Sequence, residues 1–425
     1  MTEKPSRKMP KIVDVVLLAV LVYWANLRSY NWYYAYTAYS GSVKMQLVVV
    51  VFLGLFLLWR LRWENGEREY LRAWRENWPV AAFVLLALAS LSWSVVRSST
   101  FYHASLALFV SLLAAYYGMR FSSRNLVNFV AISVGVFALA SLIMAIFLPQ
   151  YGIDSEPPYV GLWVGIFWHK NYLGAAMTLG FPAYLVIVFS RREVYSIKNK
   201  YLAGVMLAVC VLLAFLSGSA SALIVFFIQV VLFTLVLLWL RWGLRLSRRV
   251  YSWLGGGALL VAALVLSNLG LVFGLFNRSA NMTGRTPMWQ HLLDVYIAKR
   301  PLFGYGFGAF WMQEGIMEKV RAAVGWGYVV RIADNGYLDI LLGLGVVGLG
   351  LLLAMLAVGT CRSLSHALAV RDLTAFFPFF LLVHILFINI SLSYFFETEI
   401  FIWFLLVMTL FVLRPKAGVT NPITA

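Results

Sequence analysis

The sequence predicts an all-α membrane protein that crosses the bilayer many times. Of its 425 residues, 62% are hydrophobic and only 12% are charged, about half the charged share of a soluble domain. Apolar stretches of about 20 residues recur along the chain, and each is long enough to cross a hydrocarbon core of about 30 Å. The two cysteines, Cys210 and Cys361, offer neither a disulfide framework nor a metal-ligand spacing.

We expect about 12 transmembrane helices, with one large helical extracytoplasmic loop between spans 9 and 10. The basic N-terminus precedes an apolar run without a small-residue cleavage site, so this run is expected to be a retained helix. Residues 1–275 would hold helices 1–9, residues 276–336 the loop with the active site, and residues 337–425 helices 10–12 and a tail. The expected spans are 12–28, 43–59, 79–96, 103–119, 127–148, 170–190, 201–217, 219–240, 251–275, 337–359, 375–393 and 400–413.

Loop charge predicts the orientation of these spans, because Lys and Arg are retained on the cytoplasmic side. Alternate connections are rich in basic residues, whereas the short connections between them hold only Arg28, Lys44, Arg97 and Lys170. Both termini are therefore expected in the cytoplasm. The net charge of +17 is then an orientation signal that faces anionic lipid, and it does not indicate a nucleic-acid partner.

The loop at 276–336 is expected to be structured although it lies outside the bilayer. In "TPMWQHLLDVYIAKRP", Thr286 is the expected N-cap, Pro287 the first helical residue, and Pro301 the residue that stops the helix. "FWMQEGIMEKVRAA" predicts a second amphipathic helix, and "PLFGYGFGAF" between them predicts a glycine-rich turn.

Two polar groups flank this loop. Gly284, Arg285 and Thr286 precede the first loop helix, where backbone N–H groups and a guanidinium could hold a phosphate. The alternative is an arginine that only solvates a helix start. Asp334 and Asn335 lie just before span 10, and the Asp334 carboxylate could take a proton from a sugar hydroxyl. The alternative for Asp334 is a helix N-cap.

"FWHKNYLG" places His169, Lys170 and Asn171 at the outer start of a span. The helix dipole disfavours a cation at this position, so a phosphate is expected to compensate Lys170. The alternative is a lysine that reaches out to lipid headgroups.

The remaining polar and aromatic residues give weaker signals. His384 lies mid-span and is expected to make a packed or interhelical hydrogen bond, or to be functional. Residues 29–42, rich in Tyr and Trp, form an interfacial aromatic belt or a sugar-stacking surface. The five histidines are scattered, so no metal site is expected, and no nucleotide-binding or serine-hydrolase motif is present.

Four motifs in fixed order resemble the O-antigen ligase and O-antigen polymerase superfamily of bacterial envelopes, which includes exopolysaccharide polymerases. They are "LSWSVVRSSTF" at 91–101, "GIFWHKNYLG" at 165–174, "GRTPMWQHLLDVYIAKRPLFGYGFGAF" at 284–310 and "DNGYLDILLGLGVVG" at 334–348. The resemblance implies a metal-independent, inverting glycosyltransferase of the inner membrane that needs no cofactor. Such enzymes transfer a glycan from an undecaprenyl-diphosphate carrier to an acceptor sugar hydroxyl, on a glycan or on lipid A–core, at the periplasmic face.

The resemblance also implies roles for residues. Arg285, at a matched family position, and Lys170 would stabilise the departing diphosphate. Asp334 would act as the base, with His291 in the loop helix as the backup. The further substrate-binding candidates are His169, Asn171 and Asn335.

This chain departs from the family pattern at two positions. Many members have His-Asn before the Tyr-Leu of span 10, where this chain has Asp334. Many also have an arginine in the turn between spans 7 and 8, where this chain reads "LSGSASAL" and offers Ala220. The "HKN" and "DNGYLD" variants resemble the exopolysaccharide-polymerase branch, with a ligase that acts on lipid A–core as the alternative.

Two readings from other classes remain open. A transporter or flippase for a lipid-linked substrate should show internal repeats, broken helices and ionisable groups near the bilayer midplane. A non-catalytic scaffold for envelope assembly should tolerate changes at Arg285 and Asp334. The concentration of polar residues at one face favours the glycosyltransferase.

Overall fold

The computed structural model describes residues 66–157, 159–242, 285–325, 331–395 and 400–414, with parts of 54–62. The expected spans at 12–28 and 251–275, the aromatic stretch at 29–42 and most of the span at 43–59 lie outside these residues. Within them, the regular structure is helical apart from one isolated bridge between Ile153 and Trp163. The all-α prediction is therefore confirmed for this part of the chain.

Six of the described helices are long and apolar enough to cross a membrane. They are α4 (Arg97–Arg120), α5 (Ser123–Phe147), α7 (Lys170–Phe189), α8 (Ile197–Leu216), α9 (Ala220–Trp242) and α14 (Gly336–Val370). Three shorter apolar helices coincide with other expected spans: α3 (Trp78–Ala89), α15 (Leu373–Ile388) and α16 (Ile400–Val412). Two further helices were not predicted, α2 (Glu67–Glu76) and the single turn α6 (Pro149–Gly152).

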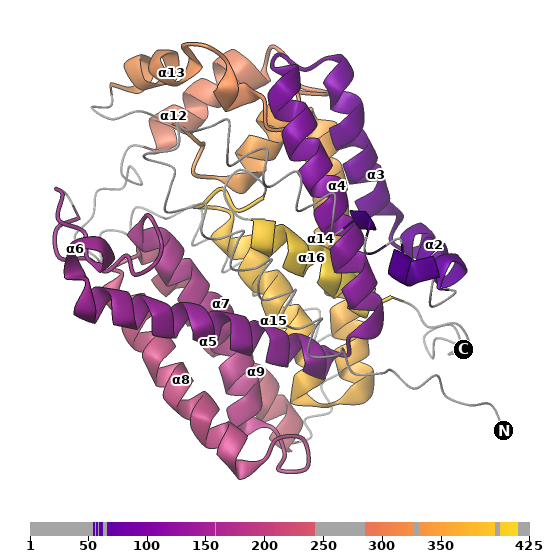
Figure 1. Ribbon diagram of the computed structural model, residues 1–425, viewed down its shortest axis with the longest axis vertical. Coiled ribbons are helices and arrows are strands. Elements are labelled where there is room, and N and C mark those ends of the chain that lie inside the picture. Colours follow the sequence, from indigo (N-terminus) through magenta and orange to yellow (C-terminus); the bar gives the residue numbers. More distant parts are fainter. Residues whose placement is uncertain are drawn as a thin grey trace.

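The helices form two groups around a buried centre (Figure 1). Helices α3 and α4 lie on one side, helices α5, α7, α8 and α9 on the other, and α15 and α16 between them. Helix α16 is the expected twelfth span, but its 13 residues extend only about 20 Å. Its described side chains are buried, with Trp403 completely so. An apolar helix without a polar face belongs in a core, so α16 is a central packing helix.

Helix α14 is broken at Gly345, whose φ of 65° is left-handed. The break frees backbone groups, and the loop that precedes α14 binds them. The N–H of Tyr305 donates to the carbonyl of Leu342 at 2.8 Å, and the N–H of Val346 donates to the carbonyl of Pro301 at 2.8 Å. Irregular backbone at membrane depth must be covered by protein or line a cavity. Here the preceding loop covers it.

Residues 285–325 form a compact helical unit, which we call the cap; the end of the bundle that carries it is the cap end. The cap contains α12 (Arg285–His291), a π-helical turn η3 (Leu292–Ile297), a 3-10 turn η4 (Phe310–Met312) and α13 (Ile316–Val324). Both predicted loop helices are present. The predicted N-cap Thr286 is wrong, because α12 already includes Arg285 and places Thr286 inside the first turn. Gly284 lies outside the described residues.

The glycine-rich turn at 301–310 fixes the cap to the bundle. Ser99 Oγ on α4 donates to the carbonyl of Gly308 at 2.6 Å. Gly308 has φ +67°, and a Cβ there would lie 2.4 Å from Cγ of His103. This turn therefore passes so close to α4 that only glycine fits.

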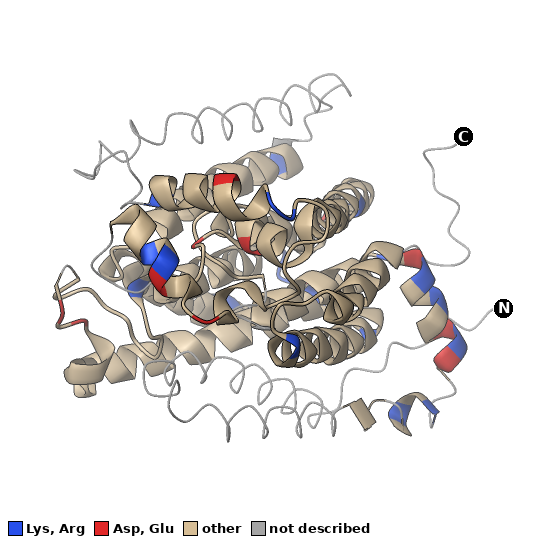
Figure 2. Cartoon of the chain, turned by 90° about the horizontal axis from the view of Figure 1, so that it is seen from above, with Lys and Arg blue, Asp and Glu red and all other residues tan. Residues whose placement is uncertain are grey.

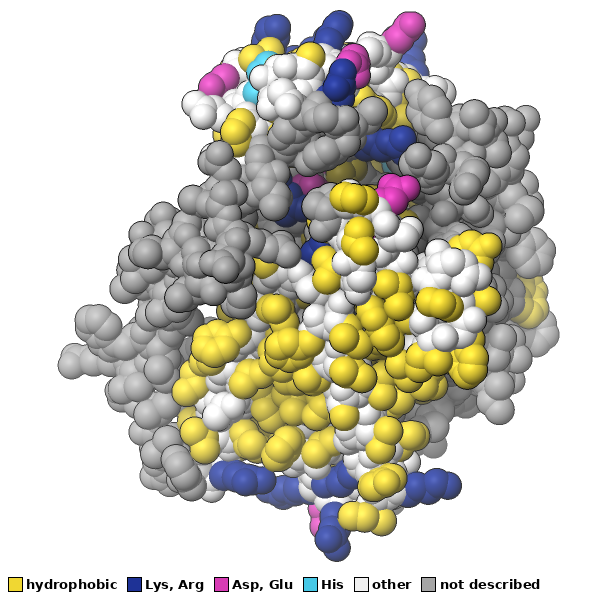
Figure 3. Space-filling view, turned by 90° about the vertical axis from the view of Figure 1, so that its left-hand side faces the viewer, with side chains coloured by type: hydrophobic (Ala, Val, Ile, Leu, Met, Phe, Trp, Pro, Cys, Tyr) yellow, Lys and Arg dark blue, Asp and Glu magenta, His cyan; other side chains and the backbone are white. Residues whose placement is uncertain are grey.

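Charge divides the molecule into zones. Figure 3 shows basic side chains along the rim opposite the cap, an apolar belt above them, and mixed charge at the cap. In the view from above, acidic and basic segments lie over the middle of the bundle at the cap end (Figure 2). This is the pattern of a multi-pass membrane protein with a basic rim at one end and a polar cap at the other.

Candidate functional site

The sequence His169-Lys170-Asn171 begins α7 at the cap end. His169 is the N-cap, and its Nδ1 accepts a hydrogen bond from the N–H of Asn171 at 3.2 Å. Burial, followed by the charges of Lys170 and then Arg285, lowers the pKa of His169 to about 3. The imidazole is therefore neutral near pH 7. The shift also places both cations within electrostatic reach of one ring, while Asn171 lies half-buried in the first helical turn.

Lys170 points into the protein. The residue is 2% exposed, which contradicts the alternative of a lysine that reaches out to lipid headgroups. Its Nζ donates to the carbonyl of Gly218 at 3.0 Å and lies 5.3 Å from the ring centroid of Tyr159. Gly218 belongs to the turn between α8 and α9, the same turn in which the family resemblance leads one to expect an arginine. The ammonium group of Lys170 thus reaches the region of that missing guanidinium.

Arg285 and Asp334 form an ion pair at the cap end. Arg285 Nε and Nη2 each lie 3.0 Å from Asp334 Oδ2, and the two side chains are 13% and 28% exposed. The pair joins two segments that are 49 residues apart. Nη1 takes no part in this contact, so part of the guanidinium fork remains for a phosphate oxygen. The sequence predicted both residues but not that they bind each other.

Asn335 is the N-cap of α14. Its Oδ1 accepts the N–H groups of Tyr337 at 3.0 Å and Leu338 at 3.2 Å. The alternative role of Asp334 as the cap is therefore wrong, because its neighbour performs it. Asp334 instead has φ 50°, a left-handed conformation that is uncommon for a residue other than glycine. Asn335 uses its side-chain oxygen as a cap, and this use removes that oxygen from substrate binding.

His291 ends α12, six residues after Arg285. Six residues correspond to about one and two-thirds helical turns, so the two side chains leave the helix on different faces. The His291 ring packs against Tyr296, with ring centroids 5.6 Å apart. The structure therefore groups Arg285 with Asp334, and the charges of Arg285 and Lys170 both act on His169. It does not place His291 with them.

His384 makes an interhelical contact inside the bundle. The residue is completely buried on α15, and its Nδ1 lies 3.2 Å from Nε2 of Gln229 on α9. This is the packed, hydrogen-bonded alternative that the sequence left open.

Sequence reasoning assigned no role to two residues near this site. Tyr159 lies in the connection between α6 and α7, where its ring contacts both His169 and Lys170; nothing in its local sequence distinguishes it. Asp339 is buried in the first turn of α14 and accepts a hydrogen bond from Trp311 Nε1 at 2.8 Å. Its place five residues after Asp334 was the available signal, because a carboxylate in an apolar span needs partners.

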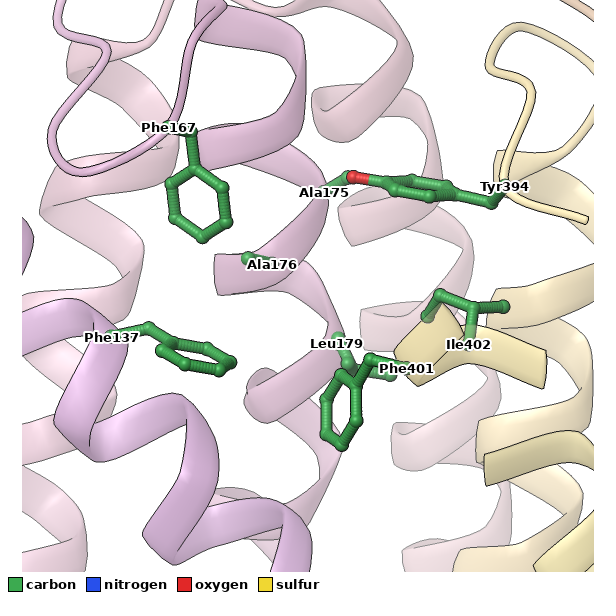
Figure 4. A pocket seen from close by; sticks show the side chains of 8 residues that line it. All are labelled: Phe137, Phe167, Ala175, Ala176, Leu179, Tyr394, Phe401 and Ile402. Atoms are coloured by element: carbon green, nitrogen blue, oxygen red, sulfur yellow. The ribbon is translucent and has the colours of Figure 1, made fainter. Parts of the chain in front are cut away.

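A small apolar pocket lies beside α7, further along the helix from Lys170 (Figure 4). Figure 4 shows aromatic rings and small alanines facing a common space, with the Tyr394 hydroxyl as its polar atom. Ala175, Ala176 and Leu179 follow Lys170 by one and a half to two and a half helical turns. The lining residues are Phe137, Phe167, Ala175, Ala176, Leu179, Tyr394, Phe401 and Ile402.

Among residues that the structure describes, no three or more His, Cys, Asp or Glu side chains gather in a way that could hold a metal ion. Among the described residues at the cap end, the guanidinium of Arg285 and the ammonium of Lys170 are two groups that could hold an anion.

Comparison with known proteins gives two matches. Residues 204–353 match the family model described as O-antigen ligase, a range that includes α8, α9, the cap and the start of α14. Over 360 residues the chain is 24% identical to the exopolysaccharide production protein ExoQ of Rhizobium meliloti (strain 1021), covering 79% of this chain and 75% of that protein. Both matches agree with the resemblance that the motifs predicted. They support a likeness of this chain to the O-antigen ligase/polymerase superfamily and, through ExoQ, to its exopolysaccharide-like branch.

Proposed function

We propose that this protein is a polyprenyl-diphosphate-dependent glycosyltransferase that polymerises a surface or exopolysaccharide. The observation that carries the proposal is the convergence at the cap end. An Arg285–Asp334 pair lies there within electrostatic reach of His169, which is followed at once by the buried Lys170, and an apolar pocket lies further along α7. A lipid-linked diphosphate needs this combination of cations and apolar surface.

The donor is an undecaprenyl-diphosphate-linked glycan. The Nη1 edge of the Arg285 guanidinium, which takes no part in the contact with Asp334, and the ammonium of Lys170 bind the diphosphate oxygens. Guanidinium contacts to phosphate are strong because they are charge-assisted. The isoprenoid chain lies along the apolar belt of the bundle (Figure 3). Lys170 reaches the α8–α9 turn through the Gly218 carbonyl, so it supplies the cation that an arginine provides there in many relatives.

The reaction is an inverting displacement. An acceptor hydroxyl oxygen forms a bond to the anomeric carbon while the bond from that carbon to the diphosphate oxygen breaks. The diphosphate leaves with the electron pair and is stabilised by the fixed cations. The hydroxyl proton passes to the carboxylate of Asp334. Arg285 contacts Asp334 and would also contact the leaving group. One guanidinium would therefore hold the base and the leaving group in fixed positions relative to each other.

The acceptor is a growing glycan rather than lipid A–core. The relative in Rhizobium meliloti is an exopolysaccharide production protein, and Asp334 and Ala220 depart from the positions where many members carry His and Arg. We infer that the cap faces the periplasm and that both termini lie in the cytoplasm, because the basic rim lies opposite the cap (Figure 3).

A transporter is less well supported. The break in α14 and the mid-span His384 favour it, but His384 pairs with Gln229. The freed Leu342 carbonyl and Val346 N–H of α14 bind backbone groups of residues 301–305. Those groups are therefore satisfied by the cap and are not available to line a path for a substrate.

The test is the surface polysaccharide profile of a deletion strain, resolved by size. Loss of long chains with single repeat units retained supports the polymerase. Unmodified lipid A–core together with accumulated lipid-linked polymer would support the ligase instead. An unchanged profile would contradict both.

A further inference from the structure

The segment that carries Asp334 is held on both sides. On one side, the N–H of Ala333 donates to Asp339 Oδ1 at 3.2 Å. On the other side, the N–H of Asn335 donates to Ser393 Oγ at 3.1 Å. Asp334 has the left-handed φ of 50°, a conformation that costs about 1 kcal/mol or more outside glycine. The flanking bonds are what keep the backbone in this conformation.

Both bonds lead to Asp339. Its Oδ1 accepts from Ala333 and from Trp311 Nε1, and its Oδ2 accepts from the hydroxyl of Ser393. Ser393 therefore bridges Asp339 and the N–H of Asn335. Asp339 is 7% exposed, and a buried carboxylate is tolerated only when its oxygens are hydrogen-bonded. Two oxygens receive three donors here.

These donors come from three parts of the molecule. Trp311 belongs to the cap, Ala333 to the segment before α14, and Ser393 to the connection between α15 and α16. Trp289 of the cap binds the same segment, because its Nε1 donates to the carbonyl of Ala333 at 2.7 Å. Cap and bundle thus meet on one carboxylate, five residues from Asp334.

We propose that Asp339 is a positioning residue, which fixes the peptides on both sides of Asp334 and so directs the Asp334 carboxylate toward Arg285 and the acceptor hydroxyl. The inference rests on the proposed function, in which Asp334 receives the proton. Asp339 itself is buried beneath this segment and touches neither substrate.

Positioning differs from simple stabilisation in a measurable way. If Asp339 acts through Asp334, its benefit disappears once the Asp334 carboxylate has been removed. If Asp339 only stabilises the junction of cap and bundle, its loss lowers activity by the same factor whether or not Asp334 is intact. A double-mutant cycle separates the two cases.

The experiment compares purified full-length wild type, Asp339→Asn, Asp334→Asn and the double variant, each normalised to the folded fraction from size-exclusion chromatography. Transfer from a synthetic polyprenyl-diphosphate glycan gives kcat and the KM for the donor. We expect Asp339→Asn to lower kcat about 10- to 100-fold, the effect of a misplaced reacting group. The donor KM should change less than about threefold, and the double variant should be no slower than Asp334→Asn alone.

Ser393→Ala provides the second route if Asp339→Asn is not recovered folded. It keeps the Asp339 carboxylate and removes only the hydroxyl that joins this carboxylate to the N–H of Asn335. It should therefore lower kcat less than Asp339→Asn does, and it should not change kcat in the Asp334→Asn background. Two controls should keep wild-type kcat. Asp372→Asn changes a helix-capping carboxylate that binds the N–H of Thr374, and Ser363→Ala removes a buried hydroxyl that binds the Thr360 carbonyl.

Three outcomes would overturn the inference. Wild-type kcat in Asp339→Asn or, if it is not recovered, in Ser393→Ala, together with a slow Asp334→Asn, would refute it while the proposed function stands. Multiplicative losses in the double variant would assign Asp339 to stability alone. Wild-type kcat in Asp334→Asn would remove the proposed base, and the inference would fall with that part of the proposed function.

Discussion

The basic residues at the two ends of the bundle differ in burial. At the end opposite the cap, partly exposed cations meet helix carboxyl ends: Arg120 Nη1 donates to the carbonyl of Tyr116 in the last turn of α4, and Lys200 Nζ donates to the carbonyl of Ser190 after α7. At the cap end, Lys170 Nζ donates in the same way to the carbonyl of Gly218 after α8, but Lys170 is only 2% exposed. Both lysines lie in the first turn of a helix, where the helix dipole opposes a cation, so burial is what sets Lys170 apart.

This difference separates partly exposed cations that stabilise helix ends from a buried cation, for which we propose a role in binding substrate. At the opposite end, Arg362 caps α2 through the carbonyl of Glu76 and the side chain of Asn77. At the cap end, Lys170 is buried against a carbonyl and an aromatic ring, and burial of an ammonium group costs several kcal/mol. We expect a bound diphosphate to add a charge-assisted contact to those that Lys170 already makes. Substitutions matched between the two ends therefore test the account.

Arg285→Ala should have the largest effect. Loss of the guanidinium at the leaving group should lower kcat for glycan transfer by about 10²- to 10³-fold, because a fixed cation acts where charge develops. Turnover of the purified protein with a synthetic lipid-linked donor measures this. Arg124→Ala is the matched control, since that exposed arginine donates to the carbonyl of Val194 at the opposite end. Equal activity in the two variants would remove the functional distinction between the ends.

Asp334→Asn should lower kcat by about 10²-fold, the lower range for loss of a general base. The amide retains the shape of the side chain but cannot accept the proton, so the Kd for the donor should change little. Single-turnover kinetics together with donor binding separate the two quantities. A weakened Kd with an unchanged chemical step would assign Asp334 to holding Arg285 instead.

Lys170→Met should raise the KM for the donor about tenfold, the value of one charge-assisted hydrogen bond. Methionine keeps the apolar stem and removes the charge. Lys200→Met, the matched change at the opposite end, should leave the KM unchanged. A KM that shifts equally in both variants would point to a general effect on membrane insertion.

His169→Asn should have the smallest effect, on acid sensitivity. The folded protein holds the pKa of His169 at about 3 against an ordinary value of 6.5. As the pH falls, His169 therefore takes up a proton in the unfolded chain before it does so in the folded protein. The contribution of His169 to the free energy of unfolding is fully present above pH 6.5 and is lost as the pH is lowered toward 3. Between pH 7 and 5 the loss is about 2 kcal/mol.

Asparagine retains the N-cap role at position 169 but does not titrate. The thermal unfolding midpoint should therefore fall less between pH 7 and 5 in His169→Asn than in the wild type. Identical acid sensitivity in both proteins would show that His169 is not held neutral by its surroundings.

Hydropathy was sufficient for the helical class and for the positions of most described helices, because a span must be apolar along its length. It was insufficient for α16, since an apolar run does not say whether lipid or protein surrounds it. It was also insufficient for the break in α14. Gly345 is one of several glycines in "LLGLGVVGLG", and only the packed residues 301–306 distinguish it.

The site was predicted as residues but not as contacts. Local signals identified Arg285, Asp334 and Lys170, because a charge at the mouth of an apolar span is conspicuous. The ion pair between Arg285 and Asp334, and the contact of Lys170 with the Gly218 carbonyl 48 residues away, depend on tertiary packing. The choice of Asn335 over Asp334 as the cap was likewise set by the left-handed turn at Asp334.

The binding of undecaprenyl diphosphate in buffer with EDTA tests the central claim most directly. We expect wild-type protein and Arg124→Ala to bind this lipid with equal Kd, and Arg285→Ala and Lys170→Met each to bind it about tenfold more weakly or worse. Equal affinity in all four proteins, or binding that appears only when a divalent cation is restored, would contradict the account.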